Sequence, residues 1–192
     1  MIDQPLPPVP ALTDPRLRSY FQILHLKTRL RRGWLRAGLS PAECESVADH
    51  SFGTALLCLL LARDVDPGRA ALMALVHELG EVHVGDIIPA DGVAKPEKHR
   101  RELAAVELVL AGLDNAVAGP IRELWDEYEA GVSPTARFVK SMDSLEMAAQ
   151  ALAYHRDGHP GMAEFLDSAG GRLAGGEWET VWRELANAQQ SE

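Results

Sequence analysis

The sequence predicts an all-α fold, a single bundle of about seven or eight helices packed around one core. Apolar residues recur at the i, i+3, i+4, i+7 spacing of helices in successive segments, and these segments are bounded by capping residues, prolines and glycines. No alternation of apolar and polar residues is long enough to indicate a strand. A chain of 192 residues, 46% hydrophobic and 24% charged, is typical of one globular domain.

The expected helices follow one another with short turns between them. Asp66 before Pro67 and Ser133 before Pro134 are strong helix starts, because each pairs a capping side chain with a proline in the first turn. Ser46 is a further expected cap, and Gly85 an expected stop. The predicted helices cover about 14–30, 46–63, 67–83, 96–112, 118–130 (begun at Pro120), 134–158, 160–168 and 177–188.

The chain is expected to have a proline-rich arm over residues 1–13 and one domain over residues 14–192. Prolines at positions 5, 7, 8 and 10 exclude a helix in the arm. The last helix carries apolar residues that predict either a contact surface or simply core: Trp178, Val181, Trp182 and Leu185.

Charge and cysteine usage limit the class of partner. A net charge of -9 argues against a general binder of nucleic acid polymers or acidic membranes, whereas a small anionic substrate is allowed if a metal and a few arginines act locally. Cys44 and Cys58 lack the CxxC spacing of zinc and redox sites, and we expect the protein to be located in the reducing cytoplasm. The first residues do not resemble a signal peptide, and the longest apolar run, 55–62, is too short to cross a bilayer.

Residues 69–91 crowd ligand-type side chains onto an apolar run. On a helix over 69–83, an apolar stripe would be formed by Leu72, Leu75, Val76 and Leu79, with His77, Glu78 and Glu81 along its edge. A buried imidazole beside a buried carboxylate is costly unless a partner or a cation compensates. A divalent metal is the simplest compensation, and other segments must then supply the remaining ligands.

Two residues elsewhere complete a possible ligand set. His50 lies in the first turn of its helix, where a lone histidine is more often a capping or solvated residue. Asp143 lies within a long helix with an apolar face, where an aspartate has a high cost of burial. With His77 and Glu78 they give two imidazoles and two carboxylates, a mixture that suits Mn, Co, Fe, Ni or Zn better than calcium.

The segment after the first helix is basic and contains Arg31, Arg32, Trp34 and Arg36. It is either a solvated face with an anchoring tryptophan or the lip of a substrate site. The second reading follows from the guanidinium group, which binds phosphate in a bidentate way, and from the indole, which can lie against a sugar or a base.

The order of these residues and of the motifs around them resembles the HD-domain phosphohydrolases, with their pattern H…HD…D. The resemblance is closer to the YfbR-like 5'-deoxynucleotidases and their eukaryotic relatives. The matching segments span residues 26–147: LKTRLRRGW, ESVADHS, ALMALVHELGEVHVGDIIPAD, PEKHRRELAA, ELWDEYE and FVKSMDSLEM. The resemblance implies an all-α, metal-dependent phosphomonoesterase that releases phosphate from deoxyribonucleoside 5'-monophosphates, commonly as a homodimer.

The resemblance also implies roles for single residues. His50, His77 and Asp143 match metal ligands, whereas the aspartate after the second histidine is here Glu78, one methylene longer, so we expect a retained but altered site. The other implied roles are general acid/base work for Glu81, positioning of substrate or water for Asp86, phosphate binding for Arg31 (or Arg32 beside it), and a sugar contact for Trp34 that could exclude a 2'-hydroxyl.

Three other functions compete with this interpretation. HELGEVH begins like the HExxH motif of metalloproteases, but the residue four positions after His77 is Glu81 and not a histidine. His83 lies six positions after His77, off the helix face that would hold a second zinc ligand. With Glu78 in place of aspartate, the domain could instead be a regulatory module that binds a nucleotide or metal without turnover. A phosphohydrolase for another small phosphate ester is the third.

Overall fold

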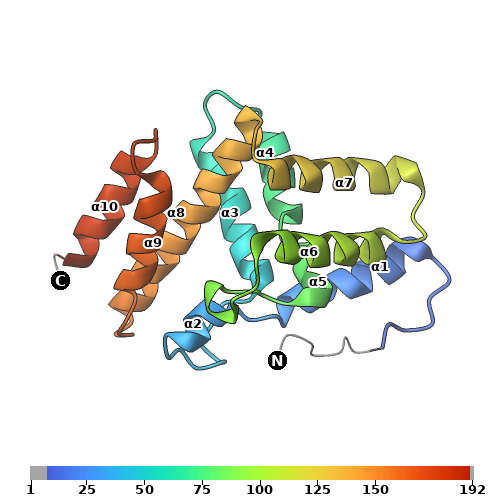
Figure 1. Cartoon of the computed structure of the whole chain (residues 1–192), viewed down its shortest axis with the longest axis horizontal. Helices are drawn as coiled ribbons and strands as arrows, with labels where there is room; N and C mark the ends of the chain where they lie inside the picture. The colour runs from blue at the N-terminus through green and yellow to red at the C-terminus, as the bar shows by residue number, and fades with distance from the viewer. Residues whose placement is uncertain (1–7, 191–192) are drawn as a thin grey trace.

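The computed structural model describes residues 8–190 and confirms the all-α fold (Figure 1). Within this range eight helices have nine residues or more: α1 (Pro15–Ile23), α3 (Val47–Leu61), α4 (Pro67–Val76), α6 (Lys95–Leu110), α7 (Asn115–Ala130), α8 (Pro134–Arg156), α9 (Ala163–Leu173) and α10 (Glu179–Gln190). The shorter elements are α2 (Arg32–Arg36), α5 (Glu81–Val84) and two 3-10 turns, Leu24–Lys27 and Pro89–Asp91. Residues 1–7 of the expected arm lie outside the described residues, and residues 8–12 form no helix or strand.

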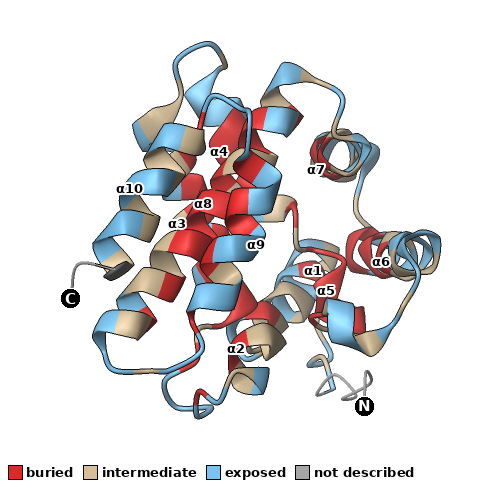
Figure 2. Cartoon of the chain, turned by 60° about the vertical axis from the view of Figure 1, so that its left-hand side comes forward, coloured by how far each residue is buried: buried red, intermediate tan, exposed pale blue. Residues whose placement is uncertain are grey.

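Helix α8 is the centre of the bundle. Ser133 caps it through a hydrogen bond from the Ala136 N–H, and its 23 residues pack against α3, α4, α7, α9 and α10. Its buried residues include Val139, Met142 and Leu145. Buried residues gather where α8 meets α3 and α4, whereas the outer faces of α9 and α10 are exposed (Figure 2). Asp143 lies on this helix between the buried residues Met142 and Ser144, and its own side chain is 21% exposed.

Helix α3 begins at the residue the sequence predicts. Ser46 and Asp49 form a reciprocal capping box, in which each side chain accepts a hydrogen bond from the other residue's backbone N–H. An isolated antiparallel bridge joins Leu30 to Ser46, with a 3.1 Å bond from the Arg31 N–H to the Glu45 carbonyl. This bridge holds Arg31 beside the first turn of α3, where His50 lies.

The expected continuous helix over 69–83 is wrong. α4 ends at Val76, residues 77–80 form a turn, and α5 resumes at Glu81. In the turn, i to i+3 hydrogen bonds replace the usual i to i+4 bonds: Leu79 N–H to Val76 carbonyl at 3.1 Å and Glu81 N–H to Glu78 carbonyl at 3.0 Å. Close packing of Gly80 on α6 accompanies this tighter winding, and periodicity along one segment cannot show such a contact.

The expected apolar stripe of α4 is also only partly buried. Leu72 and Leu75 are 56% and 48% exposed, and the helix instead buries the small residues Ala70, Ala71 and Ala74 together with Met73. Small side chains permit the close approach of α3. The leucines point outward because the neighbouring helices cover the alanine face.

Other helix boundaries also differ from the expectation, among them those of α9, which is expected over 160–168 and covers Ala163–Leu173. The first helix ends at Ile23 and gives way to a 3-10 turn. α7 begins at Asn115, with Pro120 inside it as an exposed residue. Ala116, whose carbonyl loses its helical partner to this proline, is exposed as well, so water can satisfy it.

The apolar residues of α10, together with Trp178 just before it, pack against the core. Trp178 is buried against Phe138, with ring centroids 5.7 Å apart, and Val181, Trp182 and Leu185 pack on the same clusters. The Trp182 Nε1–H donates to the Leu166 carbonyl at 2.8 Å. Of the two expected roles for these residues, contact surface or core, the structure supports core.

We predict that Gly80→Ala lowers the stability of the fold. A Cβ at this position would lie 2.6 Å from Cβ and 3.0 Å from Cα of Glu102, so α6 must shift. Such overpacking costs about 1–3 kcal/mol in the free energy of unfolding, which chemical denaturation measures. Gly171→Ala in α9 is the matched control, because nothing lies within 4 Å of its added Cβ, and it should stabilise slightly. A Gly80→Ala protein as stable as the parent would contradict the close packing.

Candidate metal centre

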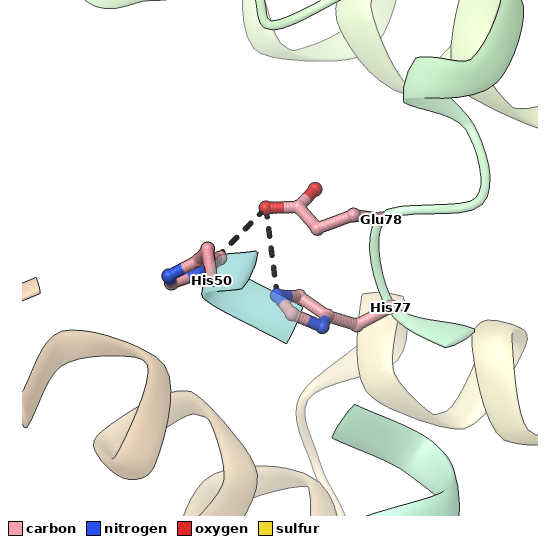
Figure 3. Close-up of side chains that lie close together, drawn as sticks. All are labelled: His50, His77 and Glu78. Carbon is pink, nitrogen blue, oxygen red and sulfur yellow. Dashed lines mark ion pairs between the residues drawn. The ribbon is translucent and has the colours of Figure 1, made fainter. Parts of the chain in front are cut away.

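Three ligand-type side chains converge where α3 meets the turn after α4. Their ligand atoms, from His50, His77 and Glu78, all lie within 4.8 Å of one another. Oε1 of Glu78 is 3.4 Å from Nε2 of His77 and 3.9 Å from Nε2 of His50, and all three side chains point to one place (Figure 3). The long side chain of Glu78 lets its carboxylate reach the imidazole of the residue before it.

Asp143 stands beside this group on α8. Its Oδ1 is 3.2 Å from Nε2 of His50, and its Oδ2 accepts a 2.9 Å hydrogen bond from the Tyr128 hydroxyl. The structure therefore brings together all four residues that the sequence analysis selected as metal ligands.

The two imidazoles are oriented as metal ligands usually are. Nδ1 of His50 lies 2.5 Å from Oε2 of Glu146, and Nδ1 of His77 lies 2.6 Å from the Ala74 carbonyl oxygen. A proton on each Nδ1 satisfies these acceptors and leaves a lone pair on each Nε2. Both Nε2 atoms are buried and, within residues 8–190, neither forms a hydrogen bond. Two orphaned nitrogens beside two carboxylates fit a divalent ion.

The charges of this cluster also favour a cation. Burial would raise the pKa values of Glu78 and Asp143, but neighbouring imidazoles, His77 for Glu78 and His50 for Asp143, hold both well below their usual range. Burial and the charge of Arg31 would lower the pKa of His50, but the carboxylates of Asp143 and Glu146 raise it to about 10. The carboxylates thus hold a positive charge at His50, and a bound ion could supply that charge in place of the proton.

The structure separates Arg31 from Arg32. Nη1 of Arg31 is 3.3 Å from Oε1 of Glu78, so its guanidinium lies at the cluster. Burial would lower the pKa of Arg31, but the surrounding carboxylates, Asp86 and Glu78 foremost, raise it. Arg32 instead forms a bidentate pair with Asp91, at 2.6 and 2.8 Å, and donates to the Asp86 carbonyl.

Glu81 and Asp86 lie near Arg31 in the interior. Glu81 is buried, and its Oε2 forms no hydrogen bond among the described residues. Burial, followed by the charges of Glu78 and Asp86, raises the pKa of Glu81 well above its usual range. Asp86 is buried too, with Oδ2 accepting the Arg32 backbone N–H at 2.5 Å.

Trp34 has no open ring face for the expected sugar contact. It is 2% exposed and packs against Tyr154 and Phe165, with ring centroids 5.3 and 4.0 Å away. Its Nε1–H donates to Oε1 of Glu45 at 2.7 Å. The indole belongs to the core and anchors a carboxylate near Arg31; spacing alone could not distinguish this from a substrate wall. His83 also points elsewhere, with Nε2 2.9 Å from the Gln22 side-chain oxygen.

Sequence reasoning missed Glu45 and Glu146, which form a second group with His50. Burial and the charge of Glu146 raise the pKa of Glu45 to about 7. A Cβ on Gly53 would lie 2.6 Å from Oε1 of Glu146, so the glycine leaves room for this carboxylate. The signals were present: Glu146 is one turn after Asp143 on α8, and Gly53 is one turn after His50 on α3.

Comparison with known proteins gives the class of this domain. The sequence model described as "HD domain" matches residues 23–182. This chain therefore belongs to the HD-domain family, whose members are metal-dependent.

Particular relatives are similar over most of their length. The 5'-deoxynucleotidase HDDC2 of Danio rerio is 41% identical over 151 residues, 77% of this chain and 74% of the relative. The human 5'-deoxynucleotidase HDDC2 is 38% identical over 163 residues, 81% and 79% of the two chains. Among solved structures, the PH0347 protein from Pyrococcus horikoshii superposes with a TM-score of 0.72 at 31% identity, covering 92% of this chain and 99% of that one.

We predict that Glu146→Ala weakens metal binding roughly 10- to 100-fold, because carboxylates that orient a ligating imidazole typically contribute this much. Titration of Mn²⁺ into the metal-stripped protein, followed by calorimetry, measures the affinity without reference to turnover. Glu184→Gln is the control, since Glu184 is an exposed carboxylate on α10. Equal affinities of the Glu146→Ala and parent proteins, with both folded, would contradict the role of Glu146.

Proposed function

We propose that the protein is a metal-dependent phosphomonoesterase that hydrolyses deoxyribonucleoside 5'-monophosphates to deoxynucleoside and phosphate. The observation that carries this proposal is the convergence of His50, His77 and Glu78, with Asp143 adjacent, in a chain similar to proteins named 5'-deoxynucleotidases. The four residues would hold one divalent ion of the Mn, Co, Fe, Ni or Zn class.

The bound ion would supply Lewis-acid chemistry, lowering the pKa of a coordinated water and neutralising charge on the phosphate. Arg31 lies at the same point, so its guanidinium would bind a phosphate oxygen and stabilise the charge that grows in the transition state. Arg31 also pairs with Glu78, and this contact keeps the longer carboxylate turned toward the centre.

Glu81 and Asp86 would complete the chemistry. The raised pKa of Glu81 favours the protonated form of its carboxyl group, which would donate to the leaving 5'-oxygen, and the resulting carboxylate would then accept a proton from water. Asp86, fixed through Arg32, would position substrate or water near Arg31. Because Trp34 is buried, we assign it to holding Glu45 and not to a contact with the sugar of the substrate.

Phosphate release tests this function directly. We expect metal-stripped protein, reloaded in turn with Mn²⁺, Co²⁺ and Zn²⁺, to release inorganic phosphate from at least one 5'-deoxynucleotide in a panel that also contains ribonucleotides and simple sugar phosphates. Release only from a non-nucleotide ester would move the assignment to another phosphate ester. Nucleotide binding without release under any metal would contradict the enzyme and favour a regulatory module that binds nucleotides.

Two variants separate proton transfer from metal binding in the same assay. Glu81→Gln should lower turnover by about 100-fold or more, in the range of general acid–base catalysis, while metal content stays at the parent level. His77→Ala should lower both, because Nε2 of His77 is one of the two orphaned nitrogens. Loss of metal in Glu81→Gln would refute the division of roles.

We further propose a cytoplasmic homodimer. Phe52, Leu56, Leu59 and Leu60 share a face of α3, and Leu72 and Leu75 share a face of the adjoining α4; all are exposed, Leu60 to 76%. Cys44 and Cys58 are free and buried, which suits a reducing compartment. Among the described residues, no helix is long and apolar enough to span a membrane.

Sedimentation at micromolar concentration should therefore give the mass of a dimer. Leu60→Glu, which places a charge on this apolar face, should shift the equilibrium toward monomer without loss of helicity. Val132→Glu, at an apolar residue 72% exposed outside α3 and α4, is the matched control. A parent protein that sediments as a monomer would overturn the homodimer.

A further inference from the structure

A hollow of ≈ 480 Å³ lies beside Asp143, between α7, α8 and the end of α9. Its wall includes Tyr128, Arg137, Lys140, Asp143, Ser144 and Arg172. Arg137, Lys140 and Ser144 follow one another at helical spacing and so share one face of α8, while Arg172 enters from α9. Three cationic side chains therefore surround one opening.

Within residues 8–190, none of Arg137, Lys140 and Arg172 forms an ion pair with a carboxylate. The Lys140 ammonium lies 3.9 Å above the centre of the Tyr128 ring. Arg137 donates to the Val132 carbonyl, and Arg172 donates to Oγ of Ser168 at 3.4 Å. Their charge is left available to a ligand in the hollow.

Arginines elsewhere in the chain are mostly neutralised. Six arginines each form an ion pair with a carboxylate: Arg16 with Asp14, Arg32 with Asp91, Arg36 with Glu164, Arg69 with Glu127, Arg122 with Asp126, and Arg183 with Glu179. With 28 acidic against 19 basic residues, carboxylates are abundant in this protein. A local excess of positive charge in such a chain attracts small anions to that place.

The hollow borders the candidate metal centre. Tyr128 lines the hollow, donates to Oδ2 of Asp143, and lies with its ring 4.9 Å from that of His77. The other oxygen of Asp143 is 3.2 Å from His50. An anion held by Lys140 and Arg172 would therefore lie on the wall that Asp143 forms between the hollow and the centre.

We propose that this hollow is a phosphate-binding subsite, in which Lys140 and Arg172, assisted by Arg137, bind a phosphate dianion next to Asp143. The dianion has two sources, the phosphate of the ester before hydrolysis and the inorganic phosphate released by it. This choice of sources rests on the proposed function, whereas the binding of phosphate does not.

The first experiment needs no turnover. Inorganic phosphate is titrated into the metal-stripped full chain at low ionic strength, with ³¹P NMR line width as the measure of binding. Lys140→Gln and Arg172→Gln should each weaken binding roughly 2- to 5-fold, as expected for partly exposed ion pairs, and the double variant should lose more. Arg63→Gln, at an exposed arginine in the turn after α3, is the control and should bind as the parent does.

Unchanged binding in the double variant, or an equal loss in Arg63→Gln, would overturn the subsite. The source of the phosphate is then read from steady-state kinetics of metal-loaded protein. A subsite for the ester raises KM in Lys140→Gln with little change in kcat, whereas a subsite for the product raises the inhibition constant of phosphate and leaves KM unchanged. Failure of phosphate release with intact phosphate binding would refute the proposed enzyme and leave the subsite standing.

Discussion

The hydrogen bond between His50 and Glu146 is the interaction on which the candidate centre depends. Both groups are buried, one on α3 and one on α8, and either alone would carry a large cost of desolvation. Together they fix the imidazole so that its other nitrogen faces Glu78 and Asp143. Gly53 on α3 leaves room for this carboxylate, because a Cβ there would lie 2.6 Å from Oε1 of Glu146. One polar contact thus links packing of the core to the geometry of the centre.

The turn after α4 supplies the other half of the arrangement. Consecutive residues point about 100° apart on an α-helix and about 120° apart in 3-10 winding, so His77 and Glu78 leave the backbone in different directions. The long side chain of glutamate nevertheless lets the carboxylate oxygen come within 3.4 Å of the preceding imidazole. Gly80 allows α6 to approach this turn closely. The extra methylene thus contributes to the reach of this carboxylate, and Arg31 neutralises part of its charge.

Much of this could be predicted from local sequence. Caps such as Ser46, Asp66 and Ser133 act within one turn, so they located three helix starts, and the four ligand-type residues come together as the sequence analysis expected. What could not be predicted depends on neighbours distant in the chain. Periodicity grouped Leu72 and Leu75 with the buried face, but the cover provided by α3 decided which side of α4 is inside. Trp34 likewise gained its partners, Tyr154 and Phe165, from helices more than 100 positions later.

The distribution of charge connects the fold to a small anionic ligand. The carboxylates of Asp86, Glu78, Glu81 and Asp143 all raise the pKa of Arg31. The positive charge of Arg31 is therefore largely balanced by the negative charges of this cluster. A phosphate that reached the centre through Arg31 alone would meet an environment that is still acidic. Lys140 and Arg172 line the hollow beside Asp143 and, within residues 8–190, form no ion pair with a carboxylate. Attraction at a distance and stabilisation at the reacting atoms thus fall to different residues, which lets a protein with a net charge of -9 admit a dianion without a positive surface.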